Sequence, residues 1–247
     1  MKNILLALSL AGVLAVPAAF AQTDNQLQAD LQKALSNSRI KGVQVAVDQK
    51  IATLTGTVDV YDIKRQAEQR AHRVKGIDAV RDHNEVGGST LPDSQLRDKL
   101  VGEISHDRIG YGTTPFNSIS VQVQNGVVQL GGFAYGPVDA DSAVAVAANT
   151  RGVKDVVNEI VVNPVSLMDD RIRLRVYRAV YGYPSLNRYA IDPAKTIRIQ
   201  VQHGNVALYG VVDSQADKDT AGIRANGVSG VFSVTNHLEV ADASKES

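Results

Sequence analysis

The residues best suited to binding a ligand gather in one stretch of the chain, residues 171–189. Arg171, Arg175 and Arg178 share one flank of this stretch if it is helical, at about 100° per residue. Further aromatic and basic residues accompany them: Tyr177, Tyr181, Tyr183, Arg188 and Tyr189. Guanidinium groups pair with phosphate, and tyrosine places its ring in the headgroup layer of a membrane while its hydroxyl stays in water. These residue types therefore predict contact with an anionic phospholipid surface.

A purely structural interpretation of the same residues stays open. The tyrosines can pack against a neighbouring part of the protein, while the arginines form a solvated face. Leu174 lies with Tyr177 and Tyr181, roughly opposite the apolar stripe that begins at Ile172. Each basic residue near an anionic membrane contributes on the order of 1 kcal/mol, so any lipid binding is expected to be weak and to weaken further with salt.

Patterns typical of catalysis or metal binding do not occur in the sequence. The chain contains no cysteine, which excludes disulfides, thiolate chemistry and cysteine-based zinc sites. Asp139 with Asp141 and Asp169 with Asp170 fit helix N-termini, where the macrodipole favours acids, better than a catalytic pair. The histidines occur at unmatched positions without an i, i+4 pair: His72, His83, His106, His203 and His237. We expect a protein that is not an enzyme and has no cofactor or metal.

The elements that must position the candidate residues are set by a threefold internal repeat. Three glycines each stand 20 residues before a second glycine, giving the pairs Gly56 and Gly76, Gly132 and Gly152, and Gly210 and Gly230. A leucine lies two residues before the first glycine of every pair, and two alanines follow that glycine at constant spacing. Such conserved internal spacing indicates one supersecondary unit used repeatedly.

Each copy predicts the order helix, strand, strand, helix, strand. An apolar i, i+4 stripe opens each copy, and alternating Val and Ile residues follow as a hairpin. The segment 171–176 alternates too, but its place in the repeat favours a helix. The alanine-bearing second helix is expected near 62–74, 139–150 and 214–228, and a continuous strand is expected to close each copy.

The predicted fold class is α+β, with three tandem modules that each place two helices on one face of a three-stranded mixed sheet. The modules are expected at 24–86, 93–162 and 167–240, with a disordered tail at 241–247. The second and third modules carry longer insertions between first helix and hairpin, where specificity often resides.

The repeated turn and glycine positions give further expectations. Asn125-Gly126 fits a type I′ hairpin turn, whereas Gln49-Lys50 at the matching place predicts a different turn. The six repeat glycines are expected to be structural: the first of each pair ends a strand, and the second caps a helix in the left-handed conformation. Asn158 and Asn236 are expected to satisfy backbone groups at a sheet edge.

The N-terminus predicts export. Lys2, the apolar run 4–16 and Ala19-Phe20-Ala21 fit a signal peptide over residues 1–21, and the apolar run is shorter than the roughly 20 residues that a membrane span needs. We therefore expect a periplasmic protein without a transmembrane span in the mature chain. The formal net charge is +0, which argues against a nucleic-acid partner.

The repeat unit resembles the BON domain. Two motifs support this resemblance. The hairpin ends in Leu-x-Gly, as in Leu130-Gly131-Gly132 and Leu208-Tyr209-Gly210. The second helix is followed by Gly-Val-x-x-Val-x-Asn, as in 152–158 and 230–236. The first module departs from this pattern with Asp82 in place of Asn. The resemblance implies binding to phospholipid surfaces, a role in osmotic or envelope stress, outer-membrane maintenance or transport, and no catalytic residue.

Two other kinds of partner stay open. As a periplasmic chaperone or interaction scaffold, the protein would bind an envelope protein and suppress aggregation of an unfolded client without vesicles, whereas lipid binding would need anionic headgroups and low salt. A peptidoglycan or polysaccharide ligand is the third alternative, without a supporting cluster of aromatic residues. The oligomeric state does not follow from the sequence.

Overall fold

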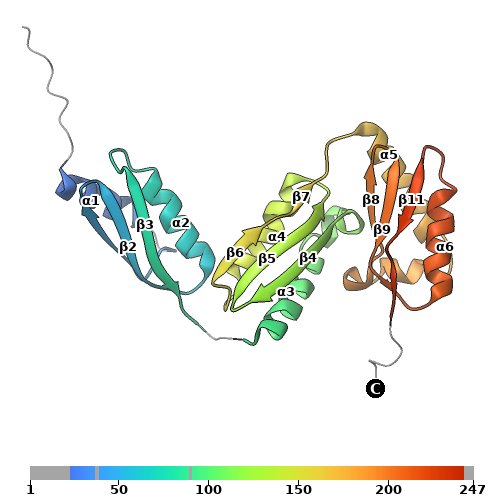
Figure 1. The fold of residues 1–247 in the computed structure, drawn as a ribbon, viewed down its shortest axis with the longest axis horizontal. Helices are drawn as coiled ribbons and strands as arrows, with labels where there is room; N and C mark the ends of the chain where they lie inside the picture. Colours follow the sequence, from blue (N-terminus) through green and yellow to red (C-terminus); the bar gives the residue numbers. More distant parts are fainter. Residues whose placement is uncertain (1–22, 37–38, 89–90, 242–247) are drawn as a thin grey trace, which may run out of the picture.

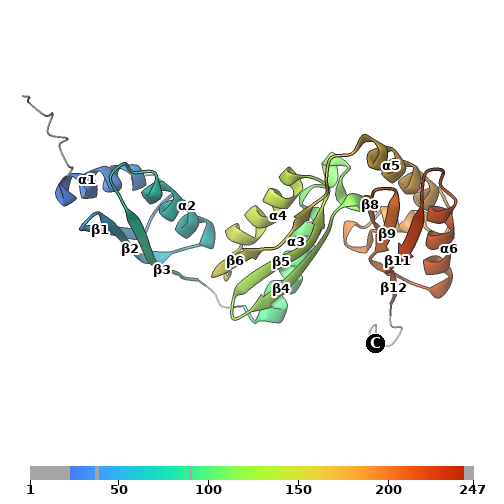
Figure 2. The same ribbon diagram turned by 45° about the horizontal axis from the view of Figure 1, so that its top comes forward.

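The computed structural model describes residues 23–36, 39–88 and 91–241, which form three α/β modules arranged in a row in chain order (Figures 1 and 2). The expected signal peptide and all but the first residue of the expected tail lie outside the described residues. Module 1 contains α1 (Asp24–Leu35), β1 (Val43–Asp48), β2 (Ile51–Val58), α2 (Tyr61–His72) and β3 (Ala79–Val86).

Modules 2 and 3 repeat this order with short 3-10 helices added in their insertions. Module 2 contains α3 (Asp93–Asp107), η1 (Ile109–Tyr111), η2 (Thr114–Phe116), β4 (Ser118–Gln124), β5 (Val127–Ala134), α4 (Pro137–Asn149), β6 (Asp155–Asn158) and β7 (Val161–Val162). Module 3 contains α5 (Leu167–Tyr181), η3 (Asn187–Ala190), η4 (Pro193–Lys195), β8 (Arg198–Gln202), β9 (Asn205–Tyr209), β10 (Val211–Val212), α6 (Gln215–Asn226), β11 (Ser233–Asn236) and β12 (Glu239–Val240).

Every module has the same sheet topology. The central strand pairs antiparallel with its hairpin partner and parallel with the last strand, giving the orders β1-β2-β3, β4-β5-β6 and β8-β9-β11. The two helices lie together on one side of the sheet, as α1 and α2 show for module 1 in Figure 2. The predicted fold class is thus confirmed, and the alternating segment 171–176 is helical within α5.

The apolar stripes and alanine faces predicted from the repeat form one core cluster in each module. Small alanine side chains let the second helix approach the sheet closely, and the leucines of the first helix fill the space beside it. The buried repeat residues are Leu31, Leu35, Leu54, Ala67 and Ala71 in module 1, Leu96, Leu100, Leu130, Ala143 and Ala147 in module 2, and Ile172, Val176, Val180, Leu208, Ala221 and Ala225 in module 3.

Modules 2 and 3 share side chains across their boundary. Phe116 of module 2 is buried in the core cluster of module 3, where its ring centroid lies 6.0 Å from that of Tyr177. Phe133 and Tyr209 bring a second pair of rings together, with centroids 5.4 Å apart. Between modules 1 and 2, Tyr61 packs against the module 2 core, and burial followed by the nearby Asp155 carboxylate raises the pKa of Tyr61 to about 12.

The hairpin turn of module 1 contradicts the expectation that it differs from the others. Gln49 and Lys50 both have positive φ, at 48° and 62°, as Asn125 and Gly126 do at 53° and 81°. The reason is a carboxylate from the first helix: Asp24 accepts hydrogen bonds from the backbone N–H groups of Gln49 (2.9 Å) and Lys50 (3.0 Å). These two bonds offset the cost of left-handed backbone in residues with a side chain.

The closing strands of modules 2 and 3 are interrupted, where the sequence predicted continuous strands. Asn158 Oδ1 accepts a hydrogen bond from the N–H of Ile160 (3.1 Å), and Asn236 Oδ1 accepts one from Leu238 (3.2 Å). β6 and β11 end at these asparagines, and in module 2 the chain resumes pairing with β5 in the same register at β7. The expected satisfaction of backbone groups by Asn158 and Asn236 is confirmed.

Asp82 makes the same local bond in module 1. Its Oδ1 accepts from the N–H of Asn84 at 2.8 Å. The repeat position needs an acceptor oxygen two residues before the receiving amide, and aspartate supplies it as well as asparagine does. β3 nevertheless stays one strand over Ala79–Val86.

The glycines that follow the second helices have the expected left-handed backbone but not the expected place. Gly76, Gly152 and Gly230 all have φ of +94°. They lie in turns three or four residues after the last helical residue, and none of them is the residue that caps its helix. The expectation of left-handed helix caps was therefore wrong, because the chain first makes a further turn that only glycine completes without strain.

Candidate functional site

The site is built on helix α5, which the sequence fixes firmly at its start. Ser166 caps the helix, with its hydroxyl oxygen accepting from the backbone N–H of Asp169 at 3.2 Å. The Asp169 carboxylate in turn accepts from the hairpin N–H groups of His203 (3.0 Å) and Gly204 (2.9 Å). Burial opposes the charge of Asp169, but these bonds, with Ser166 and Arg173, outweigh it and hold the pKa of this carboxyl below its usual value. α5 is thereby fixed to the sheet.

One face of α5 is exposed and carries the three predicted arginines, Arg171, Arg175 and Arg178. Arg175 donates one hydrogen bond to the Ser229 carbonyl oxygen at 3.3 Å. Within the part of the chain that the structure describes, none of the three forms an ion pair. Their charges are therefore available to an external anion.

Exposed apolar side chains lie among these arginines. Leu167, Met168 and Leu174 are 77%, 66% and 47% exposed. At about 100° per residue, the three arginines span about 60° of the helix circumference, with Leu167 and Leu174 beside one edge of this arc and Met168 beside the other. We call these six residues the α5 face. A helix face that alternates arginine with exposed leucine and methionine has the chemistry of a surface that lies in a membrane interface.

Three of the predicted tyrosines do not belong to the α5 face. Tyr181 is 4% exposed and donates its hydroxyl hydrogen bond to the Ile197 carbonyl oxygen at 2.6 Å, and burial raises the pKa of its phenol. Tyr189 is 2% exposed, and its hydroxyl donates to Asp217 at 3.0 Å. Tyr177 packs on Phe116 of module 2. These tyrosines hold module 3 together and contact module 2.

Arg188 and Tyr183, the other predicted members, lie in the insertion that follows α5. Arg188 pairs with Asp213 (3.0 Å) and Asp217 (2.6 Å), so its charge is neutralised within the module. Tyr183 is 40% exposed and faces the guanidinium of Arg224, whose carbon lies 5.4 Å from the ring centroid. Of the predicted group, the structure thus brings the three helix arginines together at the surface, while Tyr183 lies against Arg224 of α6.

Sequence reasoning missed Leu167, Met168 and Arg173. The first two begin the helix, and a helical wheel started at the Ser166 cap would have placed them with the arginines. Arg173 is 2% exposed: it pairs with Asp170 and donates to the Val201 carbonyl oxygen at 3.1 Å. Its guanidinium also lies 5.0 Å from the ring centroid of Tyr135 of module 2. On the same helical wheel, at about 100° per residue, Arg173 falls beside the buried Val180 and on the side opposite the three exposed arginines.

Among residues 23–36, 39–88 and 91–241, no group of three or more His, Asp or Glu side chains is arranged to hold a metal ion. In the same residues, no helix combines the length and the apolar character that crossing a membrane requires.

Comparison with known proteins places the chain in a family. The model of the BON domain matches residues 23–88, 92–164 and 169–242. The chain is 30% identical over 166 residues to osmotically-inducible protein Y of Escherichia coli (strain K12). The aligned region covers 62% of this chain and 74% of that protein.

Solved structures of CdsD, a structural protein of the type III secretion system of Chlamydia trachomatis, match with low scores. One has a TM-score of 0.25 and 15% identity, covering 87% of this chain and 92% of CdsD. The other, its C-terminal domain, has a TM-score of 0.24 and 11% identity, covering 87% of this chain and 96% of that domain. The three family matches span most of the chain, and the protein therefore belongs to the BON domain family, of which it carries three tandem copies.

Proposed function

We propose that the protein binds anionic phospholipid surfaces through the α5 face. The observation that supports this proposal is the composition of the face. Three arginines and three apolar side chains are exposed together on it, and within the described residues the arginines have no carboxylate partner. Guanidinium groups pair with phosphate oxygens in a fixed, forked geometry, and leucine and methionine side chains enter the apolar layer just beneath.

The strength of this binding follows from its parts. Three arginines contribute about 1 kcal/mol each near an anionic surface, and this contribution falls off within a Debye length. Burial of Leu167, Met168 and Leu174 adds a contribution that salt does not screen. The protein is thus expected to bind reversibly, with an affinity that falls, but does not vanish, as salt rises.

The cellular setting is part of the same proposal. The protein is similar to an osmotically inducible protein, and its N-terminal sequence fits a signal peptide. We propose that it is exported, that it supports the cell envelope under osmotic stress and that it acts by binding, without catalysis.

Co-sedimentation with vesicles tests the lipid proposal. The purified protein is spun with phosphatidylglycerol vesicles and with neutral phosphatidylcholine vesicles, at low and at moderate salt. The test variant changes Arg171, Arg175 and Arg178 to glutamine. The matched control changes three exposed basic residues of module 1 to glutamine: Lys41, Lys75 and Arg81. Both variants lose the same charge.

We expect binding to phosphatidylglycerol alone, and a loss of about 3 kcal/mol, or more than a hundredfold, in the test variant. The control variant should bind nearly as well as the unaltered protein, since its changes lie in another module. Equal binding by all three proteins would reject the α5 face as the lipid site.

A chaperone or scaffold function remains the second candidate, favoured by Phe232, which is 81% exposed at the hairpin end of module 3. A ring this exposed can hold an unfolded chain. Suppression of client aggregation without vesicles, lost on Phe232→Ser, would support this function in place of lipid binding.

A further inference from the structure

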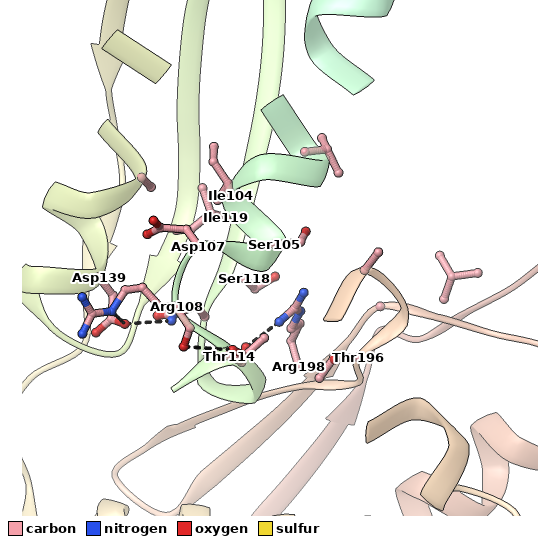
Figure 3. A pocket seen from close by; sticks show the side chains of 16 residues that line it. Ile104, Ser105, Asp107, Arg108, Thr114, Ser118, Ile119, Asp139, Thr196 and Arg198 are labelled. Carbon is pink, nitrogen blue, oxygen red and sulfur yellow. Dashed lines mark hydrogen bonds and ion pairs between the residues drawn. The ribbon is translucent and has the colours of Figure 1, made fainter. Parts of the chain in front are cut away.

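A cavity of about 220 Å³ lies between modules 2 and 3, away from the α5 face. α3 and the insertion of module 2 form one wall, and β8 with the segment around Pro193 forms the other (Figure 3). Apolar residues such as Ile104 and Ile119 line part of it. Ligand pockets commonly measure about 300–1,000 Å³, so this cavity suits a small molecule or a single charged group.

Arg198 enters this cavity as a cation without a counter-charge. Its guanidinium donates to two backbone carbonyl oxygens, those of Thr114 in module 2 and Pro193 in module 3. Within the described ranges it forms no ion pair with a carboxylate. Burial lowers the pKa of Arg198, and the opposing group is the phenol of Tyr181, which is neutral at pH 7. A partly buried charge held only by neutral groups is costly, and an anion beside it would relieve that cost.

The acidic residues of the cavity are already engaged. Asp139 pairs with Arg108 at 2.9 Å and accepts further hydrogen bonds from Thr113 and Asn117. Asp107 accepts a hydrogen bond from Ser142. Figure 3 shows the Arg108–Asp139 pair on one side of the cavity and Arg198 on the other. Within the described residues, neither carboxylate forms an ion pair with Arg198.

Two hydroxyl groups complete a set of donors. Ser105 of α3 and Ser118 of β4 line the same cavity, and the side-chain oxygen of neither has a hydrogen-bond partner in the described residues. In Figure 3 both lie on the side of the cavity that Arg198 points to. A guanidinium with free N–H groups and two free hydroxyls, from three different elements, forms a typical cradle for a phosphate or carboxylate group.

We infer that the cavity between modules 2 and 3 binds a small oxyanion, a phosphate or a carboxylate group, through Arg198, Ser105 and Ser118. Because Arg198 and Pro193 belong to module 3 and the two serines to module 2, the ligand would contact both modules. Its binding would therefore strengthen the junction between them.

Titration calorimetry of the purified full protein with inorganic phosphate, and separately with acetate, tests this inference at ionic strength held constant by chloride. We expect Arg198→Gln and Ser105→Leu each to weaken phosphate binding at least about tenfold. Arg198→Gln removes a charged hydrogen-bond donor, and Ser105→Leu fills part of the cavity with a larger side chain. Arg81→Gln, which removes an exposed arginine of module 1 outside both proposed sites, is the matched control and should bind phosphate normally.

Each outcome decides the matter. Binding of phosphate alone identifies a phosphate group as the ligand chemistry, and binding of acetate as well identifies carboxylates too. The inference would be overturned if neither ion bound, or if Arg81→Gln weakened phosphate binding as much as Arg198→Gln and Ser105→Leu do. Since Arg198 also holds the junction, Ser105→Leu decides the result if Arg198→Gln separates the two modules in calorimetric unfolding. Vesicle binding should be unchanged in Ser105→Leu, which keeps this test separate from that of the α5 face.

Discussion

At the tip of every hairpin, one aspartate from the first helix accepts hydrogen bonds from both turn amides. Asp24, Asp93 and Asp169 perform this role in the three modules, with N–O distances of 2.6–3.0 Å. In each module this pair of bonds joins the first helix to the hairpin of the sheet. A second buried acid, Asp217, accepts hydrogen bonds from the side chains of Arg188, Tyr189 and Ser214.

These contacts predict that module 3 loses stability in acid. Burial opposes the charge of Asp217, but Ser214, Tyr189 and Arg188 outweigh it and lower the pKa of Asp217, as the hairpin amides and their neighbours do for Asp169. The folded state then binds fewer protons than the unfolded state, so the stabilisation is complete above the ordinary value of about 3.9 and is lost as pH falls through the lower folded values.

Urea unfolding of module 3, followed between neutral pH and pH of about 3, measures this effect. The unaltered protein should lose stability over that range. Asp169→Asn should be less stable at neutral pH, by about 1–3 kcal/mol for a weakened hydrogen bond to a charge, and should respond less to acid. An equal acid response in both proteins would contradict the prediction.

At the scale of elements, the sequence predicted the helices, the strands and their order, because periodicity depends on local residue types that the repeat supplies three times. It did not predict the turn at Gln49-Lys50, because the partner that stabilises this turn, Asp24, lies in another element. The interruptions of the last strands were also missed. Asn158 fits an alternating strand by pattern, and the alternation continues past it to Val162, so the pattern carries no sign of the break.

The strained turn of module 1 predicts a stabilising substitution. Lys50 has φ of +62°, a conformation that costs a residue with a side chain roughly 1–2 kcal/mol and costs glycine little. Lys50→Gly should therefore stabilise module 1 by about 1 kcal/mol once the greater freedom of glycine in the unfolded chain is counted.

Chemical denaturation followed by a probe in module 1 measures this gain. The matched control is Gly126→Ala, the corresponding turn position of module 2, where φ is +81° and an added Cβ would lie 3.1 Å from the Gly152 carbonyl oxygen. The control should be destabilised by about 1 kcal/mol. A loss of stability in Lys50→Gly would contradict the strain argument.

At the scale of the whole molecule, modules 2 and 3 form a joined pair. Phe116 lies in the module 3 core, Arg173 lies over Tyr135, and Arg198 bonds to the Thr114 carbonyl oxygen. The sequence showed that the insertions were the variable part of the repeat but not which surface they cover, because that depends on the spatial relation of two modules. The same limit applies to Tyr177, which was assigned to the surface because its contact with Phe116 of module 2 could not be foreseen. Tyr181 is buried within module 3 itself, where its hydroxyl donates to the Ile197 carbonyl oxygen.

The shared core predicts that a single residue couples the two modules. Phe116→Ala should cost about 3–5 kcal/mol, the range for a buried phenylalanine, and should separate one calorimetric transition of modules 2 and 3 into two. Tyr111→Ala in the same insertion is the matched control, since Tyr111 is 71% exposed and its loss should change stability by less than about 0.5 kcal/mol. Two separate transitions in the unaltered protein would contradict the coupling.

The position of Phe116 also has a consequence for biogenesis. A ribosome completes the segment that carries this ring well before it makes the helix that shelters it, since α5 follows some fifty residues later in the chain. During synthesis, the nascent middle module exposes the apolar ring of Phe116 until α5 has been made. Holdase assistance during that interval, or delayed folding until the C-terminal third arrives, would protect the chain from premature self-association.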